Sequence, residues 1–362
     1  MKTQELYKVI AEKIGALDFG TLWPEFHPYR FALYDETEAC LDGVVFSRPE
    51  CFMGNTTVQW QGEQIAIWNV GPDMSGEVVV PDADCLAADM VHEMFHAFQM
   101  EQGENRFPDD IEALDYPFLE ENYCRKMIEN QVLAAAFRCD EIAEKKRLLS
   151  RFCSIRAGRE VLIGEASAYE FLPETVEGMA EYMGANALRA LSREKYQQKV
   201  ETYLEILEQS SPMLLDIRRQ SYYTGVVMLL TAKAVDVDFY HKIREESRPV
   251  YRLIEAAVRD GESMAVSEGQ NEYVKELYAA QKKEREETIS RIMSGYRCEA
   301  EGSFVIQGYD PMNMWKWENM LYGRHFWRLL DVENQRTIQL TGESLLRVVE
   351  GRKVTHYWTM SA

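Results

Sequence analysis

The pattern of hydrophobic and polar positions divides the chain into three parts. Residues 1–20 have the apolar spacing of a short amphipathic helix. Residues 29–80 alternate between apolar and polar side chains in short runs that are separated by Asp, Gly, Asn and Pro, which is typical of strands and turns. The predicted strands of this part are FALYD, TTVQW, EQIAIWNV and GEVVVP.

From Pro81 to about residue 295 the apolar positions recur with the period of an α-helix. Beyond residue 298 short alternating runs return and predict a second group of strands. The predicted helical stretches are 110–150, 174–191, 195–209, 221–235 and 272–294, and the predicted late strands are GSFVIQGY, RHFWRLLDV, RTIQLTG and SLLRVVEG.

Together these elements predict an α+β protein with a mainly helical centre. A chain of 362 residues exceeds one ordinary domain of about 100–200 residues. We therefore expect an N-terminal helix and β-rich lobe at 1–80, a helical domain at 81–295 and a small β-containing lobe at 296–362. Two stretches are treated as structural: KKEREE at 282–287 as the solvated face of a helix, and the aromatic-rich residues 312–317 as core or inter-lobe packing.

Charge and composition restrict the partners. The chain has 60 acidic and 40 basic residues, so its formal charge of -20 would repel a phosphate backbone, and nucleic acid is not expected as a partner. No run reaches the roughly 18 apolar residues of a membrane span, and no membrane partner is expected. The seven cysteines are scattered without a C-x-x-C pair, as expected for reduced thiols. With no secretory pattern at the start, these features predict a cytoplasmic location.

One motif carries metal chemistry. His92-Glu93-Met94-Phe95-His96 places two histidines four residues apart, so that on a helix their imidazoles lie one turn apart on the same face, as zinc binding requires. Asp82 or Asp84 can begin this helix and Gly103 can end it. Glu93 is then beside the first histidine, where its carboxylate can act as general base. Such a short string also arises by chance, so a third ligand is needed to support it.

The segment around residue 177 supplies acidic candidates for that ligand. Glu170, Glu174, Glu177 and Glu181 are spaced 4, 3 and 4 residues apart, which puts them on one face of a helix. Pro173 suits the first turn of such a helix. The face could be a solvated acidic stripe, but the small and apolar residues between the glutamates favour a helix packed against another helix.

The two motifs together resemble the gluzincin metallopeptidases. His92-Glu93-Met94-Phe95-His96 followed by Glu177-Gly178-Met179-Ala180-Glu181-Tyr182 is similar to the HExxH and E-G-x-A-x-Y helices of the aminopeptidase-like branch. The resemblance covers about residues 81–235 and implies a zincin-type catalytic domain. It implies one Zn²⁺ ion held by His92, His96 and Glu177, with Glu93 as general base.

The same resemblance implies two further roles. Glu181 occupies the place of the acidic residue that orients a zinc-bound histidine in thermolysin-like gluzincins, as ligating imidazoles usually require. Tyr222-Tyr223-Thr224-Gly225 is similar to the Y-x-x-G motif, whose tyrosine hydroxyl binds the oxyanion. Tyr222 is the matching residue, and Tyr223 remains a rival for that role.

The chain also departs from the family pattern. Eighty residues separate His96 from Glu177, and we expect inserted helices at 104–172. No G-x-M-E-N motif is present, so aminopeptidase specificity is not implied. An edge strand at residues 54–60 could pair with a substrate backbone near Asn55 and Thr56, although an ordinary internal strand is the commoner explanation.

These features predict a zinc-dependent metallopeptidase acting on a peptide or small amide. Two alternatives stay open. The same scaffold could hydrolyse a non-peptide amide or ester, because a fold does not determine its substrate. It could also be a catalytically inactive, gluzincin-like binding protein.

Overall fold

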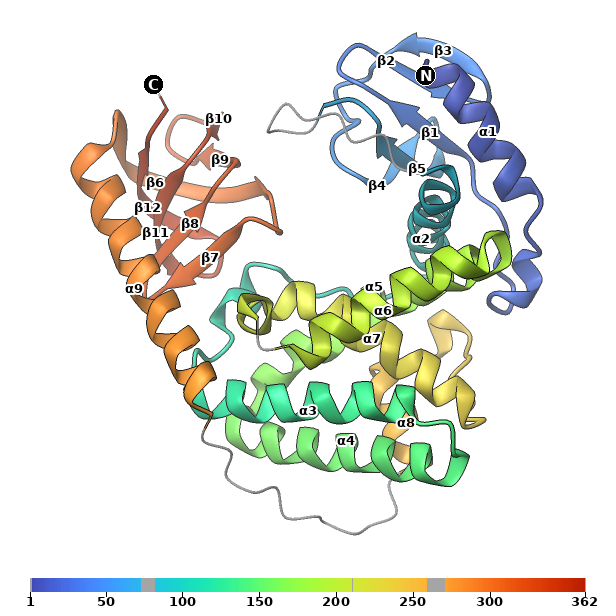
Figure 1. The fold of residues 1–362 in the computed structure, drawn as a ribbon. Coiled ribbons are helices and arrows are strands. Elements are labelled where there is room, and N and C mark those ends of the chain that lie inside the picture. The colour runs from blue at the N-terminus through green and yellow to red at the C-terminus, as the bar shows by residue number, and fades with distance from the viewer. Residues whose placement is uncertain (1, 73–81, 210, 259–270, 362) are drawn as a thin grey trace.

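A computed structural model describes residues 2–72, 82–209, 211–258 and 271–361 of the chain. It confirms the predicted α+β class: a helical body carries one β-sheet at either end (Figure 1). The predicted strand GEVVVP and Pro81 lie outside the described residues. None of the described helices is long and apolar enough to span a lipid bilayer.

The N-terminal sheet has five described strands in the order β3-β2-β1-β5-β4, and only the β1–β5 pair is parallel. Helices α1 and α2 cover one of its faces. On the other face Phe52 and the strand residues form a separate small core. The elements of this lobe are α1 (Thr3–Gly15), η1 (Phe19–Thr21), β1 (Phe31–Tyr34), β2 (Glu38–Leu41), β3 (Val44–Ser47), β4 (Thr56–Trp60) and β5 (Glu63–Asn69).

The helix that carries the histidines is α2 (Ala83–Glu101). Its beginning is determined by Asp82, whose Oδ1 accepts hydrogen bonds from the backbone N–H groups of Asp84 and Cys85. After the helix, Gly103 adopts a positive φ of 74°, which glycine tolerates without strain. Both ends of the predicted helix are therefore confirmed, with Asp82 rather than Asp84 as the cap.

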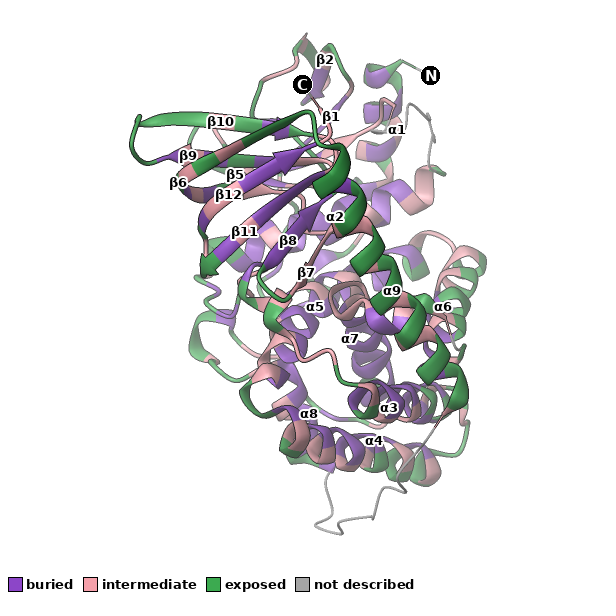
Figure 2. Cartoon of the chain, turned by 90° about the vertical axis from the view of Figure 1, so that its left-hand side faces the viewer, coloured by how far each residue is buried: buried purple, intermediate pink, exposed green. Residues whose placement is uncertain are grey.

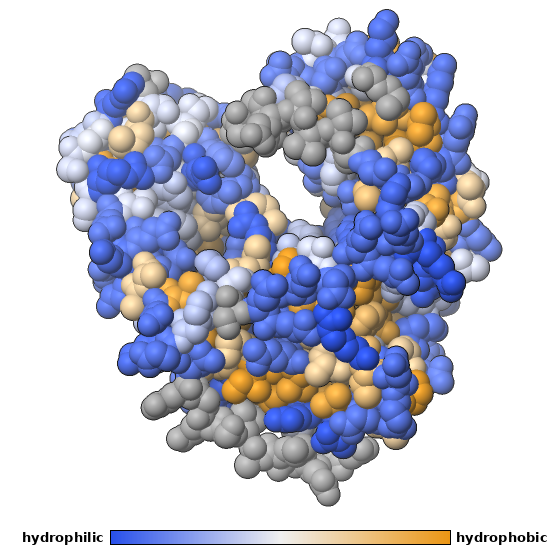
Figure 3. All heavy atoms as spheres, viewed as in Figure 1, coloured by the Kyte–Doolittle hydropathy of each residue, from blue (hydrophilic) through white to orange (hydrophobic). Residues whose placement is uncertain are grey.

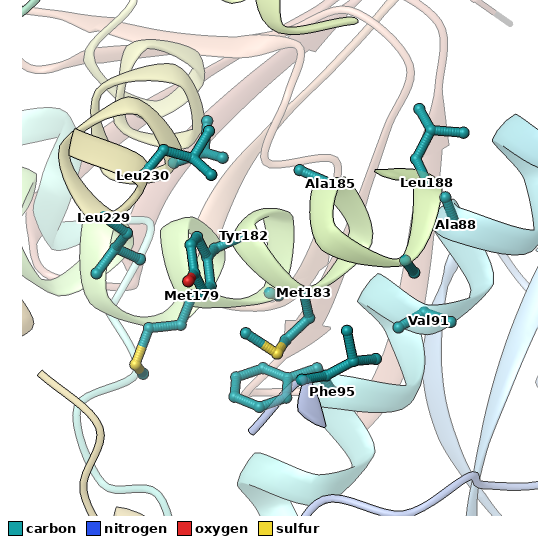
Figure 4. Packing of buried hydrophobic residues seen from close by; sticks show 14 of the residues in the cluster. Ala88, Val91, Phe95, Met179, Tyr182, Met183, Ala185, Leu188, Leu229 and Leu230 are labelled. Carbon is teal, nitrogen blue, oxygen red and sulfur yellow. The ribbon is translucent and has the colours of Figure 1, made fainter. Parts of the chain in front are cut away.

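The long helix α5 (Ala168–Leu191) is the centre of the body. It packs against α2 on one side and against α7 (Ile217–Ala234) on another, through apolar side chains such as Phe95, Met183 and Leu229 (Figure 4). The other elements of the body are η2 (Glu112–Asp115), α3 (Glu120–Arg138), α4 (Ile142–Ile163), η3 (Gly164–Ser167), α6 (Arg193–Glu208), η4 (Pro212–Leu215), η5 (Ile243–Glu245) and α8 (Val250–Val258).

Two details of the predicted helices are wrong. The stretch 110–150 is divided into η2, α3 and α4, because Pro117 disfavours helix at the residue before it and the carboxylate of Glu141 caps a new helix by accepting from two backbone N–H groups. Pro173 lies inside α5 rather than in its first turn. It is the sixth residue of that helix, so only the hydrogen bond to the carbonyl of Tyr169 is missing.

A pair of glycines brings α5 and α7 together. A Cβ added to Gly225 would lie 2.7 Å from the Cα of Gly178 and 3.0 Å from the carbonyl oxygen of Glu174. No ordinary Cβ can be accommodated at that distance, so only glycine allows the two backbones to approach this closely. The contact sets Glu177, next to Gly178, beside the helix that carries Tyr222.

This close approach predicts a stability effect. We expect Gly225→Ala to lower the free energy of unfolding by about 1–3 kcal/mol, because the two helices must separate to admit the methyl group. Gly158→Ala in α4 is the matched control, since its Cβ would meet only a side-chain atom of Arg125 at 3.8 Å. That control should be stabilising by roughly 0.5–1 kcal/mol from helix propensity. Urea unfolding of both variants tests this, and equal effects would contradict it.

The C-terminal lobe is a seven-stranded antiparallel sheet in the order β10-β9-β6-β12-β11-β8-β7. Helix α9 (Glu272–Gly295) leads into it: its first half packs on α3, and Ile292 packs on the sheet beside Leu345 (Figure 2). The strands are β6 (Cys298–Tyr309), β7 (Met314–Trp317), β8 (Met320–Gly323), β9 (Phe326–Asp331), β10 (Arg336–Thr341), β11 (Ser344–Glu350) and β12 (Lys353–Thr359). The predicted late strands are confirmed, while β7, β8 and β12 were not predicted.

Candidate metal centre

The structure brings His92, His96 and Glu177 together at the contact between α2 and α5. The Nε2 atoms of the two histidines are 3.1 Å apart, and Glu177 Oε2 lies 3.0 Å from His96 Nε2 and 3.6 Å from His92 Nε2. Four ligands placed tetrahedrally at about 2.0–2.2 Å from a zinc ion are about 3.3–3.6 Å apart. The separations are therefore compatible with one such ion, and this is the one His/Cys/Asp/Glu group of ligand geometry among the described residues.

The outer nitrogen of each histidine determines its tautomer. His92 Nδ1 is 2.9 Å from Glu181 Oε2, and His96 Nδ1 is 2.8 Å from Gln99 Oε1. Gln99 donates its amide N–H to the carbonyl oxygen of Val176, so its oxygen faces His96. Both Nδ1 atoms must then carry the proton and donate it, which leaves a lone pair on each Nε2.

Two imidazole lone pairs and one carboxylate oxygen thus converge with no proton assigned between them. Such an arrangement is repulsive unless a cation lies among the three donors. Protons compete with a metal ion for these donors. Burial lowers the pKa of His92, but hydrogen bonds with Glu177 and Glu181 raise it more, so the net pKa lies well above its usual value. The donor set fits a metal ion, and its affinity is expected to fall as the donors are protonated in acid.

Glu93 lies in the same turn of α2 and is 7% exposed. Its burial raises the pKa of its carboxyl above the usual value, partly offset by the neighbouring histidines. A raised pKa makes the carboxylate a better proton acceptor near neutral pH. Its backbone is anchored to the N-terminal sheet, because the hydroxyl of Thr57 in β4 donates to the carbonyl oxygen of Glu93 at 2.9 Å.

Glu181 is held from a second side by α6. Its Oε1 accepts from the Tyr203 hydroxyl and lies 3.0 Å from Lys199 Nζ, while Oε2 faces His92. Burial alone would raise the pKa of Glu181, but Lys199 and the hydrogen bond with His92 lower it far below its usual range. Glu181 is therefore an anchored anion that can orient His92, the role that the resemblance implies.

The two tyrosines of α7 differ in position. The Tyr222 ring is parallel to the His92 ring at a centroid distance of 6.2 Å, whereas the Tyr223 ring lies against Tyr203 at 5.8 Å. Burial, followed by the charge of Glu177, raises the pKa of Tyr222 strongly, so its hydroxyl keeps its proton and can donate. The geometry favours Tyr222 over Tyr223.

The predicted substrate strand lies beside the centre. Strand β4 is at one end of the described sheet, pairs with β5 on one side and packs on α2. The side chain of Asn55 is used internally, since its Oδ1 accepts from the backbone N–H of Asn69 at 2.9 Å. Thr56 begins β4 opposite Ile67 and is partly exposed. Any contact with substrate at these two positions would therefore involve the backbone more than the Asn55 side chain.

The four glutamates of α5 separate into two groups. Glu177 and Glu181 face the histidines, whereas Glu170 and Glu174 are fully buried in an ion network with arginines of α4. The acidic stripe is thus packed rather than solvated. Four residues near the centre were not identified from the sequence, because each is polar without a ligand-like spacing: Gln99, Lys199, Tyr203 and Arg218.

The remaining histidines do not take part in the centre. His27, His241, His325 and His356 belong to no metal-ligand group among the described residues; His325, for example, pairs with Asp310 at 2.6 Å. All seven cysteines are free thiols. Comparisons with protein-family models, with curated proteins and with solved structures give no match to this chain.

Proposed function

We propose that this protein is a zinc-dependent metallohydrolase, and that its substrates are peptides. The observation that carries the proposal is the convergence of His92 Nε2, His96 Nε2 and Glu177 Oε2, all within 4.8 Å of one another, with both outer imidazole nitrogens hydrogen-bonded. Two histidines and one carboxylate are the ligands of a catalytic zinc that keeps a position free for water or substrate. Zinc held there would polarise the scissile carbonyl and make water acidic enough to attack near neutral pH.

The residues around the donors would perform the proton transfers. Glu93 accepts the proton of the attacking water and delivers it to the leaving amine. Tyr222 donates its hydroxyl hydrogen to the oxygen that becomes negative as the carbonyl is attacked. Glu181 and Gln99 keep the two imidazoles in the tautomers that expose Nε2.

Peptide is favoured over other amides by the position of β4. No described strand pairs with its outer side, and Thr57 ties the strand to the backbone of Glu93. An extended peptide that added to this strand would pass beside the general base, with affinity from main-chain hydrogen bonds. An opening separates the two sheet-bearing lobes above the helical body (Figure 3).

Metal content and cleavage test this function together. Protein purified without added metal should contain one zinc per chain, and His92→Ala should lose it, whereas His27→Ala, at an exposed histidine, should retain it. A mixed peptide library analysed by mass spectrometry should show cleavage that a zinc chelator abolishes and added zinc restores. Intact peptides with hydrolysis of simple esters or amides would favour the non-peptide alternative. A folded protein without stoichiometric zinc would favour an inactive binding protein.

A further inference from the structure

A second feature lies between the helical body and the C-terminal lobe. A cavity of about 840 Å³ is lined by the start of α7, by α9 and by the β7–β8 hairpin. It adjoins the metal centre, because Arg218 lines the cavity and its Nη2 also lies 3.4 Å from Glu177 Oε1. A molecule positioned at the three metal-ligand donors could therefore extend into this space.

The charge of the cavity is opposite to that of the chain. Its lining includes six basic and four acidic side chains, whereas the whole protein has a formal charge of -20. Four of the six basic side chains are neutralised by carboxylates, as in the pairs Arg218–Asp110 and Arg291–Glu343. Arg285 and Arg324 form no ion pair with any residue in the described ranges, so their charges are available to a ligand.

Arg285 is the more informative of the two. Its guanidinium carbon lies 4.7 Å from the ring centre of Phe118 and 5.5 Å from that of Trp315, and its Nη1 donates to the carbonyl oxygen of Lys316. Its buried Nε has no hydrogen-bond partner in the described structure. Burial lowers the pKa of Arg285 below its usual value, the direction expected when a cation leaves water without a counter-charge.

An uncompensated cation of this kind opposes folding. Partly desolvated charges without a partner destabilise a protein, and such costs are concentrated at sites that bind ligands. The sequence did not reveal it, because Arg285 lies in KKEREE, which was predicted to be solvated throughout. The other five residues of that stretch are not buried, whereas Arg285 is only partly exposed and packs against the rings of Phe118 and Trp315.

We propose that this cavity binds a carboxylate group of the substrate through Arg285 and Arg324. The inference rests on the proposed function and restricts its substrates to peptides or amides that carry a carboxylate on one side of the cleaved bond. Guanidinium groups bind carboxylates through parallel, charge-assisted hydrogen bonds. The aromatic side chains of the lining, Trp315 and Tyr322 among them, contact the apolar part of the same ligand.

Binding to matched peptides tests the proposal independently of catalysis. Calorimetry on Glu93→Gln protein, which should not consume the peptides, would compare three peptides of one sequence: a free C-terminus with Gln, an amidated C-terminus with Glu, and an amidated C-terminus with Gln. We expect at least one carboxylate peptide to bind about tenfold or more tightly than the neutral peptide. The two carboxylate peptides distinguish a terminal from a side-chain carboxylate.

Variants assign the preference to the cavity. Arg285→Met and Arg324→Met should each reduce the carboxylate preference several-fold, whereas Lys283→Met, which removes an exposed charge from the same helix, should leave it unchanged. Equal binding of all three peptides, or a preference that survives both arginine substitutions, would overturn the proposal. If either of these results were obtained while the wild-type protein bound zinc and cleaved peptides, the proposed function would still hold. If the protein preferred the carboxylate peptides but neither bound zinc nor cleaved any peptide, the proposed hydrolase function would be refuted and the carboxylate site would not.

Thermal unfolding adds a readout that a structural role would change. Arg285→Met should unfold at the same or a higher temperature than the wild type, because methionine fits between two aromatic rings and removes an uncompensated charge. A clear fall in the melting temperature would overturn the claim that the charge of Arg285 is uncompensated.

Discussion

Glu93→Gln is expected to abolish hydrolysis while zinc remains bound. The amide has the shape of the carboxylate but cannot accept the proton of the attacking water, so kcat should fall by roughly 10²–10⁴-fold. The metal-ligand atoms of His92, His96 and Glu177 are untouched, and zinc content should stay at one ion per chain. Peptide cleavage and elemental analysis on the same preparation measure both quantities.

Glu101→Gln is the matched control for this substitution. Glu101 ends the same helix, but its side chain is about half exposed and it contacts Tyr29 and His27 rather than the metal-ligand donors. The Glu101→Gln variant should retain wild-type activity. A Glu93→Gln protein that cleaved peptides at the wild-type rate would refute Glu93 as general base, and one that lost zinc would show a structural role instead.

Arg156→Met is expected to be the most destabilising single change. Arg156 is fully buried, donates to Glu129 at 2.6 Å and to Glu174 at 2.5 Å, and lies over the ring of Phe152. Removing it leaves two buried carboxylates without their shared partner, which costs about 3–5 kcal/mol. That loss is a large part of the roughly 5–15 kcal/mol that stabilises a typical domain.

Urea unfolding followed by circular dichroism would measure this loss. Arg147→Met is the control, because Arg147 lies on the same helix, is about half exposed and forms its only ion pair within the described residues with Glu144. It should change stability by about 0.5 kcal/mol or less. Because Glu174 is one turn from Glu177 in α5, Arg156→Met should also weaken zinc binding. Equal destabilisation by the two variants would contradict a structural role for the buried network.

Much of this protein could be predicted from local patterns. Alternation and helical periodicity indicated the α+β class. Asp82 and Asp84 marked the start of the histidine helix, because an N-cap is a contact between near neighbours, and the structure shows that Asp82 is the cap. The pairing of His92 with His96 needed only the four-residue spacing of one helix. The predicted helix boundaries were wrong near Pro117 and Pro173.

The roles of the α5 glutamates depended on tertiary structure. Glu170, Glu174, Glu177 and Glu181 share one helical face, so periodicity cannot distinguish them, and only the resemblance singled out Glu177. The helices packed against α5 distinguish them. Helix α4 supplies arginines to Glu170 and Glu174, and α2 supplies histidines to Glu177 and Glu181. That choice depends on which helices meet, which the spacing within one helix does not encode.

The HExxH motif and the helix that carries it were determined by the sequence itself, because every contact they require lies within one or two turns. Gln99, Lys199 and Arg218 were assigned to the centre by the fold alone, and so was the position of Arg285 in the cavity. The distinction is physical. Capping and helical spacing act between neighbours in the chain, whereas the charge environment of a buried side chain is made by segments that lie far apart in sequence.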